Sequence, residues 1–175
     1  MIDSTLRAAA AAVLAVLVAA PLPALAQESS NVVATEGDWT VFSASNPKEC
    51  WAVSPPKTTV NTRDGKPVEV QRGDIRLYVA YRPGAAGEVS FSGGYPFASG
   101  STVDLTVGGQ TFKLFTEGES AWTGSPSEDE KVIGALRAGS DAVLTGRSGR
   151  GTTTVDTFSL SGVTAATNKA REACQ

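Results

Sequence analysis

Two alternating segments joined by a glycine pair place the strongest constraint on the fold of this chain. Residues 102–107 and 110–115 each alternate apolar and polar side chains, and Gly108-Gly109 stands between them. Two glycines can adopt the positive φ angles of a two-residue hairpin turn. Pairing the segments across this turn places Leu105 opposite Phe112 on one face. The pattern therefore predicts an antiparallel hairpin with one buried face.

The charged residues of the hairpin support the same register, because Asp104 then lies beside Lys113 on the other face. A shift of one residue would break the apolar and the charged match together, so a single pairing is predicted. The alternation in Asp74–Tyr81 indicates another half-buried strand. Further short strands are expected at Trp39–Phe42, Glu49–Val53, Val89–Phe91, Ala142–Arg147 and Thr153–Leu160. Many short strands joined by turn residues predict an all-β sandwich.

Two helices are expected within this β-rich chain. Ser127 followed by Glu130 has the spacing of a capping box, ahead of an apolar stripe, and Gly139 is placed to end that short helix. A C-terminal helix is expected over Gly162–Cys174. Its apolar stripe is mostly alanine, so packing alone would stabilise it weakly. A further attachment to the core is therefore expected.

The amino terminus has the three parts of a secretory signal peptide. Arg7 supplies a basic start, Ala8–Ala20 is apolar, and Ala24-Leu25-Ala26 offers a small-x-small cleavage site. The apolar run is too short for a membrane span of about 20 residues, and no later segment is long and apolar enough. We therefore expect a signal peptide over residues 1–26 and one exported domain over residues 27–175. The expected location is the periplasm or the outer envelope, with no membrane span in the mature chain.

Cys50 and Cys174 are the only two cysteines of the chain. An exported chain reaches an oxidising compartment, and the pair lacks the C-x-x-C spacing of redox sites. We expect one intrachain disulfide that ties the C-terminal helix to the strand carrying Trp51. The alternative is that each cysteine bonds to another chain and forms a covalent oligomer.

The composition argues against several classes of function. The chain contains no histidine, which excludes Ser-His-Asp triads and most zinc sites. Its net charge is −3 and remains so without the signal peptide, which argues against nucleic-acid binding. We expect no metal, no cofactor and no catalytic residues, and interpret the chain as a non-enzymatic protein.

Two short motifs have functional and structural interpretations. Ser54 and Lys57 match the S-x-x-K pattern of penicillin-binding enzymes, but the two intervening prolines oppose the helical turn that this chemistry needs. Arg72-Gly73-Asp74 matches the tripeptide that some adhesive proteins present to integrins. Such short matches are frequent by chance, and Gly73 is explained by its place before a strand.

The candidate binding surface consists of Trp122 and the basic turn that carries Arg147 and Arg150. Large aromatic residues in a small sandwich usually belong to the core, and of the three tryptophans we consider Trp122 the candidate for the surface. The expected partner is an envelope or host-surface protein. The alternative function is an envelope enzyme, such as a glycan hydrolase that uses paired carboxylates. The acidic residues considered for it are Glu117, Glu119, Glu128, Asp129 and Glu130.

Five segments in order along the chain resemble the invasion-associated locus B family. They are Gly37–Val41, Glu49–Ser54, Gly93–Phe97, Ser148–Gly151 and Phe158–Gly162. The signal peptide and the terminal cysteine add to the resemblance, which covers essentially the whole mature chain. It implies an immunoglobulin-like β-sandwich in the envelope of a Gram-negative bacterium, and a link to host-cell entry in the founding members. Those members carry a further cysteine where this chain has Phe42-Ser43, which suggests a two-cysteine branch with an envelope role.

Overall fold

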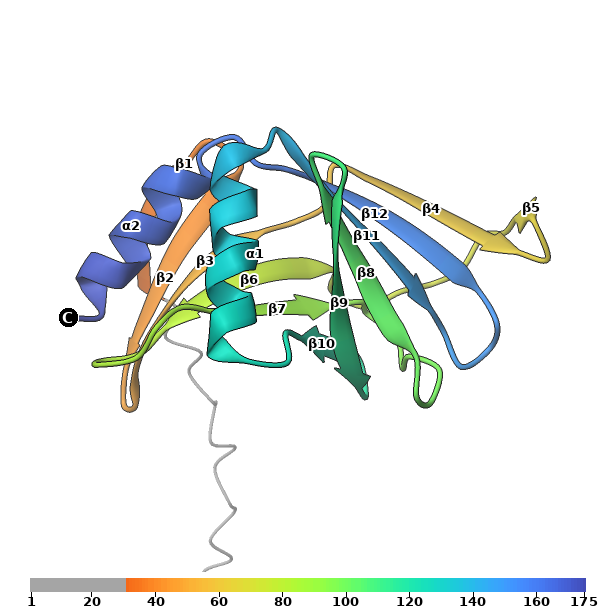
Figure 1. Cartoon of the computed structure of the whole chain (residues 1–175), viewed down its shortest axis with the longest axis horizontal. Helices are drawn as coiled ribbons and strands as arrows, with labels where there is room; N and C mark the ends of the chain where they lie inside the picture. Colours follow the sequence, from red (N-terminus) through yellow and green to blue (C-terminus); the bar gives the residue numbers. More distant parts are fainter. Residues whose placement is uncertain (1–30) are drawn as a thin grey trace, which may run out of the picture.

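Twelve antiparallel strands form one hydrogen-bonded sheet in a computed structural model that describes residues 31–175 (Figure 1). The predicted signal peptide, residues 1–26, lies outside the described residues. The strands are β1 Asn31–Glu36, β2 Trp39–Ser45, β3 Lys48–Ser54, β4 Thr58–Arg63, β5 Lys66–Pro67, β6 Arg76–Tyr81, β7 Glu88–Ser92, β8 Thr102–Val107, β9 Gln110–Glu117, β10 Ser120–Trp122, β11 Asp141–Arg147 and β12 Thr153–Ser159. The helices are α1 Pro126–Ala138 and α2 Val163–Ala173.

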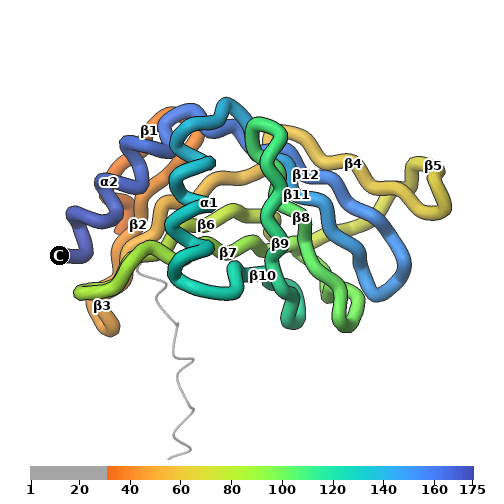
Figure 2. Tube along the Cα trace, in the orientation of Figure 1, coloured from red at the N-terminus to blue at the C-terminus, as the bar shows by residue number. Residues whose placement is uncertain are grey.

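The order of strands in the sheet is β1-β2-β3-β6-β7-β10-β9-β8-β11-β12-β4-β5. The sheet curls, α2 lies across β1, β2 and β3, and the β4–β5 hairpin projects at the end away from α2 (Figures 1 and 2). The prediction of an all-β, sandwich-like fold with a short helix between strands and a C-terminal helix is confirmed. The expected sandwich is built from one continuous sheet, in which the β8–β11 pair links the first eight strands of the order to β11, β12, β4 and β5.

The predicted hairpin register is confirmed. Leu105 pairs with Phe112, and Asp104 pairs with Lys113. Leu105 is fully buried, whereas the Lys113 ammonium lies 2.7 Å from the Asp104 carboxylate on the outer face. The apolar pattern and the turn glycines therefore specified the same pairing.

The core is a single cluster of buried apolar side chains from the sheet and both helices. Its largest fully buried members are Trp39, Phe91 and Phe158. Phe91 and Phe158 pack edge to face with ring centroids 6.1 Å apart. The indole N–H of Trp39 donates to the backbone oxygen of Ser159, so this buried polar group is paired. Trp39 therefore belongs to the core, as expected, whereas Trp51 is only partly buried and is not one of the core residues.

Helix α1 begins two residues earlier than the sequence pattern suggested. Ser125 is the N-cap and Pro126 follows it, which suits proline because the first helical N–H has no partner inside the helix. The Ser125 hydroxyl accepts from Glu128 N, and the Glu128 carboxylate accepts from Gly124 N at 2.8 Å. The capping box is thus Ser125 with Glu128, and the prediction of Ser127 as the cap is wrong. Gly139 follows the last helical residue, as predicted.

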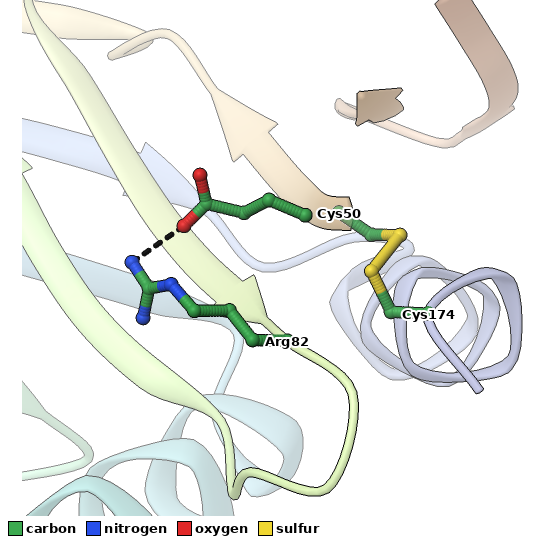
Figure 3. The surroundings of a disulfide bond; sticks show 4 residues. Cys50, Arg82 and Cys174 are labelled. Carbon is green, nitrogen blue, oxygen red and sulfur yellow. Dashed lines mark ion pairs between the residues drawn. A yellow bond between two sulfur atoms is a disulfide. The ribbon is translucent and has the colours of Figure 1, made fainter. Parts of the chain in front are cut away.

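Helix α2 is attached to the sheet by the predicted disulfide. Cys50 and Cys174 are bonded, with their Cα atoms 5.8 Å apart, and both side chains are buried. Figure 3 shows the bond between the end of the helix and β3. Nearby, the Arg171 guanidinium lies over the Tyr81 ring at 5.5 Å. The alanine-rich helix therefore has the covalent attachment that its weak apolar stripe required, and the alternative of intermolecular bonds does not apply.

The extended segment 68–75, which joins β5 to β6, is held by a buried arginine. Arg72 forms two hydrogen bonds to the Asp156 carboxylate, at 2.7 and 2.6 Å, and two more to the backbone oxygen of Gly93. Its side chain is 6% exposed and that of Asp156 is 0% exposed. The guanidinium also lies over the Tyr95 ring at 5.0 Å. The Arg72-Gly73-Asp74 tripeptide is therefore a structural element whose arginine is closed to a receptor.

Candidate functional site

The three predicted surface residues lie in two different parts of the molecule. Trp122 is the last residue of β10, Arg147 ends β11, and Arg150 lies in the turn between β11 and β12. Trp122 lines one groove and Arg150 lines another, and Arg147 is among the lining residues of neither. The structure therefore separates the aromatic candidate from the basic ones, and each groove is considered on its own.

The first groove, called here the aromatic groove, has a volume of about 450 Å³. It lies where β9, β10 and the start of β7 meet the amino end of α1. Its lining residues are Glu88, Phe115, Glu117, Trp122, Thr123, Gly124, Ser125, Pro126 and Asp129. An exposed phenylalanine, a partly buried tryptophan and three carboxylates thus share one surface.

The aromatic pair results from the pairing of two neighbouring strands. Phe115 of β9 lies directly opposite Trp122 of β10, and their rings stack with centroids 5.7 Å apart and planes inclined by 30°. Gly118 has a φ of 58° in the turn between the strands, a conformation that glycine adopts most readily. Phe115 is 48% exposed, because its neighbour Leu114 points into the core and is fully buried. A large apolar side chain thus occupies a position on the solvent face of the sheet.

Asp129 connects the groove to the core. Its carboxylate oxygen Oδ1 accepts from the backbone N–H of Val89 at 2.7 Å and from the Thr123 hydroxyl at 2.6 Å. The residue is only 6% exposed. Burial raises the pKa of Asp129 above its ordinary value, and the hydrogen bonds from Thr123 and Val89 oppose that shift. The side chain therefore fixes α1 against β7 and the end of β10.

The other two carboxylates of the groove differ in their charge partners. Glu88 forms an ion pair with Arg82 at 3.1 Å, and Arg82 also pairs with Glu49 of β3. Glu117 is exposed, and within residues 31–175 it forms no ion pair. The lining set contains no lysine or arginine. Glu117 therefore supplies the uncompensated negative charge beside the aromatic pair.

The second groove, of about 560 Å³, lies between segment 68–75 and the β11–β12 turn. Arg63, Arg72 and Arg150 line it together with Glu69 and Glu119, and Arg72 is paired with the buried Asp156, which leaves two arginines and two glutamates. The Arg63 guanidinium donates to the Thr152 hydroxyl at 2.8 Å. The turn itself is held by hydrogen bonds, including Gly149 N to Pro96 O at 3.1 Å. The turn is therefore held against the rest of the fold by these contacts.

The S-x-x-K motif does not form a nucleophilic site. Ser54 is fully buried and its hydroxyl donates to the backbone oxygen of Asp38 at 2.9 Å. The Lys57 ammonium instead contacts the Asp38 carboxylate at 2.6 Å. This hydrogen bond from Lys57, with a second from Ser159, holds the pKa of Asp38 below its ordinary value. Both residues of the motif therefore stabilise the junction between β3 and β4.

Sequence reasoning missed the partners that make Trp122 part of a groove. Phe115 was assigned only to a strand, and β10 is too short to give a recognisable pattern. One signal was present, because Lys113, Phe115 and Glu117 occupy alternate positions on the polar face of β9. An aromatic residue between two charged ones on that face indicates exposure. Glu88 gave no comparable signal.

Neither helix in residues 31–175 has the length and apolar character needed to cross a membrane. The same part of the chain has no group of three or more Cys, Asp or Glu residues placed to hold a metal ion.

Comparison with known proteins gave two findings. A family model described as Invasion associated locus B (IalB) protein matches residues 39–171. A crystal structure of invasion associated protein b from Bartonella henselae aligns with a TM-score of 0.55 and 17% sequence identity, and the match covers 78% of this chain and 94% of that chain. At this identity the likeness concerns the fold. No curated protein matched the chain.

Proposed function

Because this chain belongs to the invasion associated locus B family, we propose that it is an exported, non-enzymatic binding protein of the cell envelope. Its partner is an envelope or host-surface protein, and contact with a host cell is one use of such binding. The buried disulfide supports export, because disulfides persist in oxidising compartments. The predicted signal peptide supports the same route. The periplasm or the outer envelope is thus the proposed location.

The observation that carries the binding role is the stacked pair Phe115 and Trp122 in an open groove. Aromatic residues are enriched at protein interfaces, where they supply large contact areas at a small loss of side-chain entropy. The exposed Phe115 keeps apolar area in contact with water on the polar face of its strand. A partner that covers Phe115 would remove this apolar area from water.

A photo-crosslinking amino acid at position 115 tests the proposal in intact cells. We expect a specific crosslinked partner from position 115 and none from the same probe at Val60. Val60 is a suitable control because it is 52% exposed and lies in β4, outside the aromatic groove. If envelope and host-membrane preparations give no specific crosslink from position 115, the binding role of the groove is refuted.

The alternative is a carboxylate-dependent glycan hydrolase, because three carboxylates line the same groove. Two of them already have structural partners. Asp129 accepts from Val89 and Thr123, and Glu88 is paired with Arg82. We therefore favour binding. Cleavage of envelope glycans by the purified protein, abolished by Glu117→Gln or Asp129→Asn, would favour the enzyme instead.

A further inference from the structure

We propose that the aromatic groove recognises an arginine or lysine side chain carried by an extended protein segment. This inference rests on the binding role proposed above and specifies the chemistry of the partner. It combines the stacked rings of Phe115 and Trp122 with the free carboxylate of Glu117.

The rings provide the first half of the recognition. A cation is attracted to the negative face of an aromatic ring, with tryptophan the strongest of the side chains and arginine the most frequent cation. This chain already uses the same contact twice within its fold. Arg72 lies over Tyr95 at 5.0 Å and Arg171 lies over Tyr81 at 5.5 Å. In the groove, no cation from the described residues 31–175 lies over the ring of Phe115 or Trp122.

The charge of the groove provides the second half. Every ionisable residue that lines it is acidic. Glu88 is paired with Arg82, which also pairs with Glu49, and Asp129 is buried beneath the surface, whereas Glu117 is exposed beside Phe115 on the same face of β9. A basic side chain stacked on the rings can therefore reach Glu117. An anionic partner, such as an acidic lipid surface or a nucleic acid, would be repelled.

The dimensions of the groove favour a protein segment over an isolated cation. A volume of about 450 Å³ exceeds the space that one side chain fills, and the lining continues from the ring pair past Thr123 to Pro126. Residues on either side of the basic residue can thus contact the groove. A neutral glycan could stack on the rings, but it would gain no charge attraction from Glu117.

Fluorescence anisotropy with labelled peptides tests this inference on the oxidised exported protein. The probes are three matched peptides that alternate alanine with arginine, lysine or glutamine. We expect the arginine peptide to bind at least as tightly as the lysine peptide, and the glutamine peptide to bind more weakly. The Kd of the glutamine peptide should exceed that of the arginine peptide by about twofold to thirtyfold, which is the range expected for one cation–aromatic contact.

Variants of the protein separate the groove from general charge attraction. Trp122→Leu and Glu117→Gln should each weaken binding of the arginine peptide. Glu172→Gln removes the same charge from α2, away from the groove, and should leave the Kd within about twofold. Circular dichroism and a free-thiol assay verify that each variant is folded and oxidised.

Three outcomes would overturn the inference. They are equal binding of the glutamine and arginine peptides, equal weakening by Glu117→Gln and Glu172→Gln, or tighter binding of a neutral oligosaccharide that Trp122→Leu abolishes. If the peptides do not bind while the crosslinker at position 115 captures a partner, the cationic ligand is refuted and the binding role stands. If both experiments are negative, the proposed function fails as well.

Discussion

Replacing Arg72 with methionine tests whether the buried ion pair holds segment 68–75 to the sheet. Methionine keeps much of the apolar stem of arginine but removes the guanidinium. The substitution leaves the Asp156 carboxylate, which is 0% exposed, without its cationic partner. It also removes both donors to the backbone oxygen of Gly93. The substitution therefore leaves a buried charge and a buried hydrogen-bond acceptor without partners.

The expected loss is large relative to the stability of the domain. Breaking a buried ion pair by removing one partner destabilises a protein by about 3–5 kcal/mol, because the remaining charge is uncompensated. A domain of this size typically unfolds with about 5–15 kcal/mol. We therefore expect Arg72→Met to lower the free energy of unfolding by about 3–5 kcal/mol. The pair Lys113 and Asp104 is exposed, so Lys113→Met should lower it by less than about 1 kcal/mol.

A double-mutant cycle isolates the interaction between the two side chains. Urea unfolding of the oxidised protein measures Arg72→Met, Asp156→Leu and the double variant. Replacing both charges with apolar residues leaves no unpaired buried charge, so the double variant should lose much less free energy of unfolding than the sum of the losses of the two single variants. Additive losses, or a loss for Arg72→Met as small as that for Lys113→Met, would refute the reasoning.

Three further predictions concern the disulfide, the helix cap and Asp129. Reduction of the bond between Cys50 and Cys174 should lower the free energy of unfolding by up to about 5 kcal/mol, and hydrogen exchange should rise first in α2 while the β8–β9 hairpin stays protected. Non-reducing electrophoresis should show a monomer, and a thiol-sensitive dimer would contradict the intrachain bond. Ser125→Ala should lower the free energy of unfolding by about 1 kcal/mol and Ser127→Ala by much less, and equal losses in thermal unfolding would count against the assigned cap. Because burial raises the pKa of Asp129, the contribution of this side chain to stability is fully present below its unfolded pKa and is lost as the pH rises through its folded pKa. The stability of Asp129→Asn relative to the native protein should therefore be greater at pH 7 than at pH 3. Urea unfolding at both pH values measures the difference in stability between the two proteins, and a difference that is the same at both would show that the raised pKa has no effect on folding.

The features that the sequence predicted are those determined by neighbouring residues. The β8–β9 hairpin combines a glycine turn with two matched faces, so local chemistry and register agree. The predicted position of the α1 cap was wrong because Ser125 and Ser127 stand two residues apart and either could cap the helix. Pro126 decides between them only once its place in the first turn is known. Strands β1, β4, β5 and β10 were missed, since they are short or exposed and show weak alternation.

The features that could not be predicted depend on contacts between distant segments. Arg72 reads as part of a common tripeptide until β12 brings Asp156 to it, 84 residues further along the chain. The aromatic groove requires β10 to pair with both β9 and β7, and a three-residue strand gives no periodicity from which to infer this. Trp122 was a reasonable candidate, but its stacking partner and the acidic surroundings were visible only in three dimensions.

The order of strands in the sheet delays the completion of folding. Strand β4 is made long before β12, which is its hydrogen-bonding neighbour along most of its length. The chain must therefore close a very long loop before this edge of the sheet is completed, and such non-local pairing slows folding. Cys174 lies 124 residues after Cys50, so the covalent bond to β3 also has to wait for a distant part of the chain. A polypeptide with this connectivity stays incompletely folded until β12 and α2 are available, which agrees with the export proposed above, because a chain that crosses a membrane must fold afterwards.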